Sequence, residues 1–155
     1  MAILTIYKYP HTILRQRAKK IPTIGKSIQK LVDDMMDTLQ NSGGVGLAAN
    51  QIGVLKRLIV IQLPEDKEPT AYINTEIIHR EGEREVQEGC LSIPGYYGNI
   101  TRSMWIKAKG MDRKSRIIKI TAEGLLSQVL EHELDHINGI LYIDHLKTHE
   151  DLIKE

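Results

Sequence analysis

The stretch TAEGLLSQVLEHELDHING, residues 121–139, predicts a helix around which the rest of this 155-residue chain is organised. Thr121 is a suitable N-cap residue, and Glu123 suits the positive end of the helix dipole. We expect the helix to run to about Asn138, because Gly139 is a good residue for the left-handed position that ends a helix.

The sequence HELDH within this helix places two histidines one turn apart on the same face. His132 and His136 can therefore reach one metal ion, while Glu133 points to the side of that ion and suits a general base acting on an activated water. The pattern is short, and a solvated helix face is the plain alternative. Leu125 and Val129 precede the histidines on the same face, so the histidines continue an apolar stripe, and buried polar groups there need a partner.

A catalytic site of this kind needs a third protein ligand. The extended motif of one metalloprotease class would place a histidine where this chain has Tyr142. Cys90, in EGCLS, is a candidate because a thiolate is a strong ligand for iron or zinc, although a lone cysteine can also be a small buried hydrophobe. The remaining histidines have no motif around them and are expected to be surface or structural residues: His11, His79, His145 and His149.

The other segments predict a single α+β domain spanning residues 1–155. Residues 25–42 form an amphipathic helix with its apolar stripe at helical spacing: Ile28, Leu31, Val32, Met35 and Leu39. Strand-like runs follow at residues 57–63, 70–78, 84–89, 104–111 and 116–121. No helix separates successive strands, which favours antiparallel pairing. The final nine residues are too mixed in charge for a firm assignment, and a frayed helix is one interpretation.

Composition limits the classes of partner. A formal net charge of +1 gives no overall field that would favour stable binding to nucleic acid or a membrane. The segment from Arg102 to Lys119 carries seven basic residues against Asp112. They alternate with Ile106, Ala108 and Ile117, which predicts the solvated face of a half-buried sheet.

The N-terminus lacks the pattern of a secretory signal, and no apolar run is long enough for a membrane helix. Cys90 is the only cysteine, so no internal disulfide can form. Both observations lead us to expect a cytoplasmic protein.

Three motifs in order resemble those of peptide deformylases: GVGLAANQ at 44–51, EGCLS at 88–92 and HELDH at 132–136. The similarity extends to HTILRQRAKKI, INTEII and NGILYID, and so covers nearly the whole chain. It implies an α+β fold with antiparallel sheets packed around a central helix that carries HExxH. It also implies removal of the N-terminal formyl group from formyl-methionine of newly synthesised polypeptides, with release of formate.

The resemblance assigns roles to individual residues. It makes Cys90, His132 and His136 the ligands of one divalent metal ion, with Fe²⁺ as the usual native metal and Zn²⁺, Ni²⁺ or Co²⁺ as substitutes. Glu133 would accept a proton from water and return it to the departing amine. The Gln51 amide and the Leu91 backbone N–H would stabilise the oxyanion.

The resemblance also implies an apolar methionine pocket, for which Leu125, Val129 and His132 are candidates. Gln128 replaces a usual apolar residue there, and Tyr97 stands in a loop where many members carry arginine. The glycine-rich segment Gly44, Val45 and Gly46, together with Gly89, suits close approach of backbone and substrate. The expected partners are N-formylmethionyl nascent peptides, and a transient ribosome contact through the basic segment stays open.

Two rival functions share parts of this pattern. An HExxH endopeptidase would cleave internal peptide bonds, but it lacks its usual third ligand here. A non-catalytic metal-binding module would need a closed fourth position, and it does not explain Glu133 and Gln51.

Overall fold

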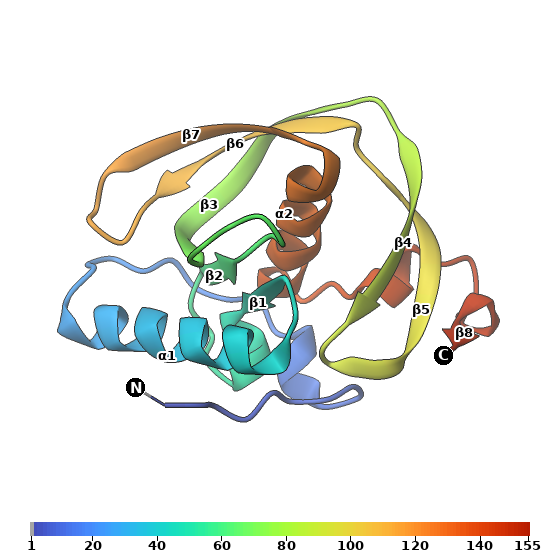
Figure 1. The fold of residues 1–155 in the computed structure, drawn as a ribbon, viewed down its shortest axis with the longest axis horizontal. Helices are drawn as coiled ribbons and strands as arrows, with labels where there is room; N and C mark the ends of the chain where they lie inside the picture. The colour runs from blue at the N-terminus through green and yellow to red at the C-terminus, as the bar shows by residue number, and fades with distance from the viewer. Residues whose placement is uncertain (1) are drawn as a thin grey trace.

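The computed structural model describes residues 2–155 and contains two sheets that enclose a helix (Figure 1). The helices are α1 (Lys26–Ser42) and α2 (Gly124–Ile137), with short 3-10 turns η1 (Thr12–Arg15), η2 (Ala49–Ile52), η3 (Tyr142–His145) and η4 (His149–Asp151). The strands are β1 (Gly46–Ala48), β2 (Leu58–Ile61), β3 (Thr70–Glu81), β4 (Arg84–Cys90), β5 (Ile93–Arg102), β6 (Trp105–Met111), β7 (Ile117–Glu123) and β8 (Ile153–Lys154).

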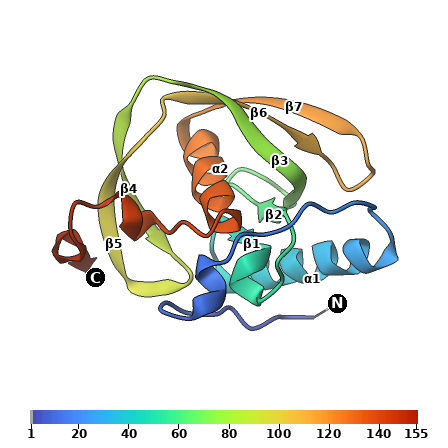
Figure 2. The ribbon, with the colours of Figure 1, turned by 180° about the vertical axis from the view of Figure 1, so that it is seen from behind.

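All strand pairs in the two sheets are antiparallel. The larger sheet has the order β1-β2-β3-β6-β7, and the smaller has the order β4-β5-β8. Seen from both sides, α2 lies between the sheets while α1 runs along the outside of β1 and β2 (Figures 1 and 2). This arrangement is the predicted α+β class with a central HExxH helix.

A long bent hairpin joins the sheets, because β3 continues into β4 and β5 continues into β6 (Figure 1). The bend is sharp at Gly82, whose φ of +67° suits glycine. The Met104 N–H closes the bend by donating to the carbonyl of Glu81 at 3.0 Å. The hairpin therefore carries the smaller sheet around to face α2.

Helix α1 buries its predicted apolar stripe, but α2 does so only in part: Val129 is buried, whereas Leu125 is 43% exposed, because it lies in the first turn of the helix at the mouth of a cavity. On α1, Ile28, Val32, Met35 and Leu39 are buried against β2 and neighbouring residues, with Leu31 partly buried beside them. On α2, Val129, Leu130, Leu134 and Ile137 pack with Ile59, Ile61 and Ile106 of the larger sheet. The methionine of this α1 stripe, Met35, is core filler, as its helical spacing indicates.

Several local predictions were wrong. Thr121 lies within β7, and α2 begins at Gly124 with Glu123 as an N-cap that makes no side-chain cap bond. Strand β7 also has the opposite phase, because Ile117 is 68% exposed. Ile118, Ile120 and Ala122 are the β7 residues that pack toward the core, while Ile106 and Ala108 of β6 are buried as expected.

The sequence patterns missed three strands: β1, β5 and β8. Strand β5 contains Gly95 and Gly98, which weaken strand propensity, and it forms because it pairs with β4 at Ile93 and from Gly98 to Arg102. The chain ends in η4 and then β8, which pairs with Tyr96 and Tyr97, so the tail is not the frayed helix that was one interpretation.

Candidate metal centre and active site

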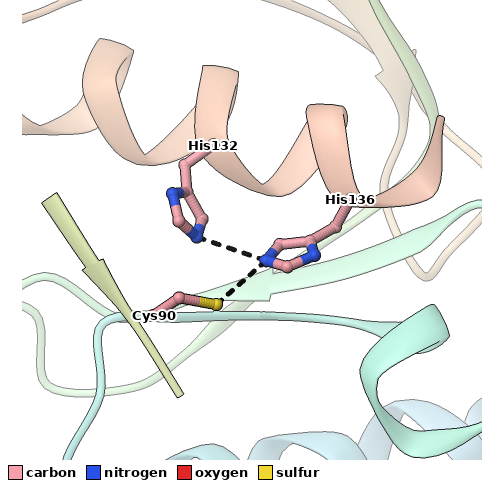
Figure 3. A group of neighbouring side chains, drawn as sticks. All are labelled: Cys90, His132 and His136. Atoms are coloured by element: carbon pink, nitrogen blue, oxygen red, sulfur yellow. Dashed lines mark hydrogen bonds between the residues drawn. The ribbon is translucent and has the colours of Figure 1, made fainter. Parts of the chain in front are cut away.

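Three potential metal ligands converge between α2 and the end of β4 (Figure 3). Their ligand atoms, Cys90 Sγ and a ring nitrogen from each of His132 and His136, all lie within 4.8 Å of one another. His136 Nε2 is 3.3 Å from Cys90 Sγ and 3.2 Å from His132 Nε2. One sulfur and two imidazole nitrogens are a donor set that suits Zn²⁺ or Fe²⁺, so the residues fit a metal ion.

The geometry follows from where each residue lies in the fold. A four-residue spacing on α2 brings the two histidines onto one face. Cys90 comes from the smaller sheet, at the end of β4. It lies at a register irregularity that follows Glu88 in the β4–β5 pairing. This irregularity ends regular pairing and turns the thiol toward α2.

A buried ion-pair network holds one of the histidines. His132 Nδ1 lies 2.7 Å from Glu88 Oε1, and both Glu88 oxygens accept from Arg102 at 2.8 and 2.9 Å. Arg102 also donates to Asp135 Oδ2 at 2.7 Å. Burial raises the pKa of Glu88, but the hydrogen bonds from Arg102 and His132 outweigh burial and bring it to about 2. The carboxylate is therefore charged and holds His132 with Nε2 directed at the other ligands.

The two ligand histidines differ in protonation. Burial lowers the pKa of His136 well below its usual range, which favours the neutral form that binds metals. Burial also lowers the pKa of His132, but the charge of Glu133 and the contacts with Cys90 and Glu88 together outweigh burial, and the net shift is well upward. Metal binding at His132 therefore displaces a proton.

Glu133 lies beside this cluster and is buried. Burial raises the pKa of its carboxyl to about 7. Its Oε1 makes no hydrogen bond to any residue in the 2–155 range. A buried carboxylate with a free oxygen and a pKa near neutrality is suited to proton transfer.

Gln51, in η2, is held in place by hydrogen bonds close to the ligand cluster. Its Oε1 accepts from the Ala48 N–H at 2.9 Å, and its Nε2 donates to Ser92 Oγ at 3.1 Å. The same Nε2 is 3.7 Å from Cys90 Sγ. The amide group is therefore held with its Nε2 between Ser92 and the potential ligand Cys90.

The comparisons with known proteins agree with this geometry. A family model described as polypeptide deformylase matches residues 3–151. The chain belongs to this family. Members of the polypeptide deformylase family remove N-terminal formyl groups from nascent peptides, and the resemblance carried by the three motifs is confirmed.

Individual relatives cover nearly the whole chain. The peptide deformylase of Dehalococcoides mccartyi strain BAV1 is 51% identical over 152 residues, which are 98% of this chain and 91% of the relative. That of Azotobacter vinelandii is 46% identical over 150 residues, covering 96% and 89%.

Solved structures show the same fold. The peptide deformylase of Legionella pneumophila has a TM-score of 0.91 at 45% identity, covering 94% of this chain and 87% of that one. The Synechococcus elongatus enzyme in complex with actinonin has a TM-score of 0.92 at 34% identity, covering 97% and 82%.

A cavity of about 650 Å³ opens beside the cluster that this deformylase chain assembles. It is lined by Gln51, Cys90, Leu91, His132 and Glu133. The substrate-binding residues expected from the sequence also line it, except for one: Gly44, Val45, Gly46, Gly89, Leu125, Gln128 and Val129 do so.

The exception is Tyr97, which is absent from the cavity lining among the residues the structure describes. It pairs with Ile153 of β8, and its neighbour Tyr96 lines the cavity instead. Successive strand side chains point to opposite faces, so the choice between the two tyrosines depends on the register of a strand that the sequence pattern did not indicate.

Sequence reasoning missed the residues that support the ligands: Glu88, Arg102 and Asp135. Glu88 could have been found, because it begins EGCLS. The remaining histidines are placed as expected. His11, His79 and His149 are exposed, and the partly exposed His145 contacts Asp135.

Proposed function

We propose that this chain removes the formyl group of N-formylmethionyl peptides with Cys90, His132 and His136 as the ligands of one divalent metal ion. The observation that carries the proposal is the placement of Glu133 and Gln51 next to that ligand set, on the wall of one cavity. Neither residue is needed merely to hold a metal. Together they supply a base and a hydrogen-bond donor for hydrolysis of an amide.

When bound, the ion supplies a Lewis acid that polarises the formyl oxygen and lowers the pKa of water. The chain itself moves the protons. Glu133 accepts a proton from the attacking water while the water oxygen forms a bond to the formyl carbon. The carbon–nitrogen bond then breaks, Glu133 gives the proton to the departing amine, and formate and a free N-terminus result.

The negative charge that develops on the formyl oxygen needs donors. Gln51 Nε2 and the Leu91 backbone N–H are the proposed donors, and one such donor typically contributes about 3 kcal/mol to lowering the barrier. The methionine side chain would occupy the part of the cavity lined by Leu125, Gln128 and Val129.

Finer assignments belong to the same proposal. Residues 1–155 act as one catalytic domain, Fe²⁺ is the native ion, and Zn²⁺, Ni²⁺ or Co²⁺ can replace it. The enzyme works in the cytoplasm on nascent chains, with at most a transient ribosome contact through the 102–119 segment. Within the described chain no helix has both the length and the apolarity needed to cross a membrane.

Formate release from formyl-Met-Ala-Ser tests the proposal, with acetyl-Met-Ala-Ser and casein assayed in parallel. We expect formate from the formyl peptide alone, and loss of activity when a chelator removes the metal. Casein cleavage would favour the endopeptidase. Tight metal binding without any hydrolysis would favour the non-catalytic module.

A further inference from the structure

A continuous chain of polar contacts runs from the protein surface to a proposed metal ligand. His145 Nε2 lies 2.9 Å from Asp135 Oδ2, and the same oxygen accepts from Arg102 Nη1 at 2.7 Å. Arg102 donates through Nε and Nη2 to the two oxygens of Glu88. Glu88 Oε1 then contacts His132 Nδ1 at 2.7 Å.

The outer end of this series of contacts is its most exposed part. The side chains of Arg102 and Glu88 are 3% and 4% exposed, that of Asp135 is 15% exposed and that of His145 is 36% exposed. Because a carboxylate only accepts, His145 Nε2 carries the proton that it shares with Asp135. His145 belongs to η3 and Asp135 to α2, so the contact also ties the segment after the helix to the helix itself.

The donors of Arg102 explain how the contact between His145 and Asp135 can affect His132. Arg102 is buried and has a planar fork of donors, so its orientation is fixed by the acceptors on both sides. Asp135 holds one edge of the fork and Glu88 the other. If Asp135 turned away, Arg102 would lose an acceptor, and the Glu88 carboxylate that aims His132 would be less firmly held.

We propose that His145 is a positioning residue, which fixes Asp135 and thereby keeps the Arg102–Glu88 pair aligned on His132. The proposal rests on the proposed role of His132 as a metal ligand. His145 touches neither substrate nor metal, and it acts only through this chain of contacts. Replacing His145 should therefore change metal binding, whereas replacing a surface histidine that lacks these contacts should not.

The test uses the full chain loaded with Zn²⁺. The dissociation constant for Zn²⁺ is measured by competition with a chelator, and the His132 Nδ1–H resonance is followed by NMR. In His145→Leu the donor is lost. We expect Zn²⁺ to bind about tenfold more weakly, at the lower end of effects seen for groups that support metal ligands, and the resonance to shift.

Two further variants separate positioning from folding. His145→Gln keeps an N–H donor and should return both measurements toward the wild-type values. His79→Leu is the matched control, because His79 is another surface histidine, 3.4 Å from Glu81, with no connection to the ligands. It should change neither value. If His145→Leu fails to fold, Asp135→Asn, which keeps the shape of the side chain, should weaken Zn²⁺ binding and shift the resonance.

The proposal is overturned if a folded His145→Leu protein binds Zn²⁺ as tightly as the wild type with an unmoved His132 resonance, whatever its melting temperature. Unchanged values in Asp135→Asn would overturn it in the same way. In both cases the wild-type protein is assayed in parallel. If it releases formate and binds Zn²⁺ tightly, the proposed function still holds although the role of His145 does not. A wild-type chain that bound no Zn²⁺ would overturn both.

Discussion

Gly46 and Glu133 lie so close that no side chain fits between them: a Cβ atom on Gly46 would be 2.5 Å from Glu133 Oε2 and 2.9 Å from two carbons of the same side chain. The backbone of β1 therefore forms the wall against which the proposed base rests. Glycine at this position is explained by the contact and not by a special backbone conformation, since Gly46 is absent from the positive-φ residues among 2–155.

Gly46→Ala should displace Glu133 while leaving every chemical group of the site in place. Misplacement of a reacting group by about 1 Å can cost roughly 100-fold in rate, so we expect kcat to fall at least tenfold with metal content unchanged. Gly25→Ala is the matched control, because nothing lies within 4 Å of a Cβ built there. Full activity of a folded Gly46→Ala protein would contradict the role of the contact.

Glu133→Ala should keep the metal and lose nearly all deformylation, because it removes the base while all three ligands remain. General acid–base groups contribute about 100- to 10,000-fold, which sets the expected loss. Metal content and turnover are measured on the same sample. His132→Ala should instead lose both, and a metal-free Glu133→Ala protein would show that the assigned role is wrong.

Gln51→Leu should lower kcat by about 100- to 1000-fold and change KM far less, since the amide acts mainly on the oxyanion. The structure adds a second effect. The buried Ala48 N–H loses its acceptor, which should cost about 1–3 kcal/mol in the free energy of unfolding. Steady-state kinetics and thermal unfolding separate the two effects, and an unchanged kcat would remove Gln51 from the mechanism.

Gln128→Leu should increase activity on formyl peptides whose first residue has an apolar side chain. Gln128 lines the cavity, and its Nε2 donates to the Gln87 carbonyl at 3.1 Å, which places a polar group where methionine is proposed to bind. We expect kcat/KM for formyl-norleucine peptides to rise by up to about tenfold. Gln128→Glu, which adds a charge, should lower it. Equal values in all three proteins would place the methionine pocket elsewhere.

The choice of metal should determine sensitivity to air. Cys90 is partly exposed, and a ferrous site with one thiolate ligand can lose iron or be oxidised at sulfur. We expect protein prepared anaerobically with Fe²⁺ to be highly active and to decay in air, a Ni²⁺ form to be comparably active and stable, and a Zn²⁺ form to be weaker. Equal and air-stable activity of all three forms would rule out this redox weakness.

The ligands and the base could be predicted from the sequence because each lies within a short motif. HELDH needs only helical geometry to place His132, His136 and Glu133. The supporting role of Arg102 could not be found in this way, because Arg102 meets Glu88 and Asp135 only after the β4–β5 hairpin folds onto α2. Their separations along the chain carry no periodic signal.

The elements that the sequence did not predict share a physical cause. Strands β1 and β8 are very short, and β5 contains glycines, so pairing with neighbours decides their conformation more than local propensity does. The phase of β7 was also undecided locally, because RIIKIT has isoleucines that can face either side. The β6–β7 register pairs the buried Ile106 and Ala108 with Ala122 and Ile120, which turns these β7 residues inward and leaves Ile117 on the opposite face.

The division of the ligands between two layers has a consequence for the whole molecule. Cys90 belongs to β4 of the smaller sheet, whereas both histidines belong to the helix that packs on the larger one. A bound ion is thus a reversible cross-link between the layers, and the unfolded chain holds no matching arrangement of donors. By mass action, an ion at about 1000 times its dissociation constant would add about 4 kcal/mol to the free energy of unfolding. The melting temperature of a preparation is therefore a gauge of how many of its molecules carry metal.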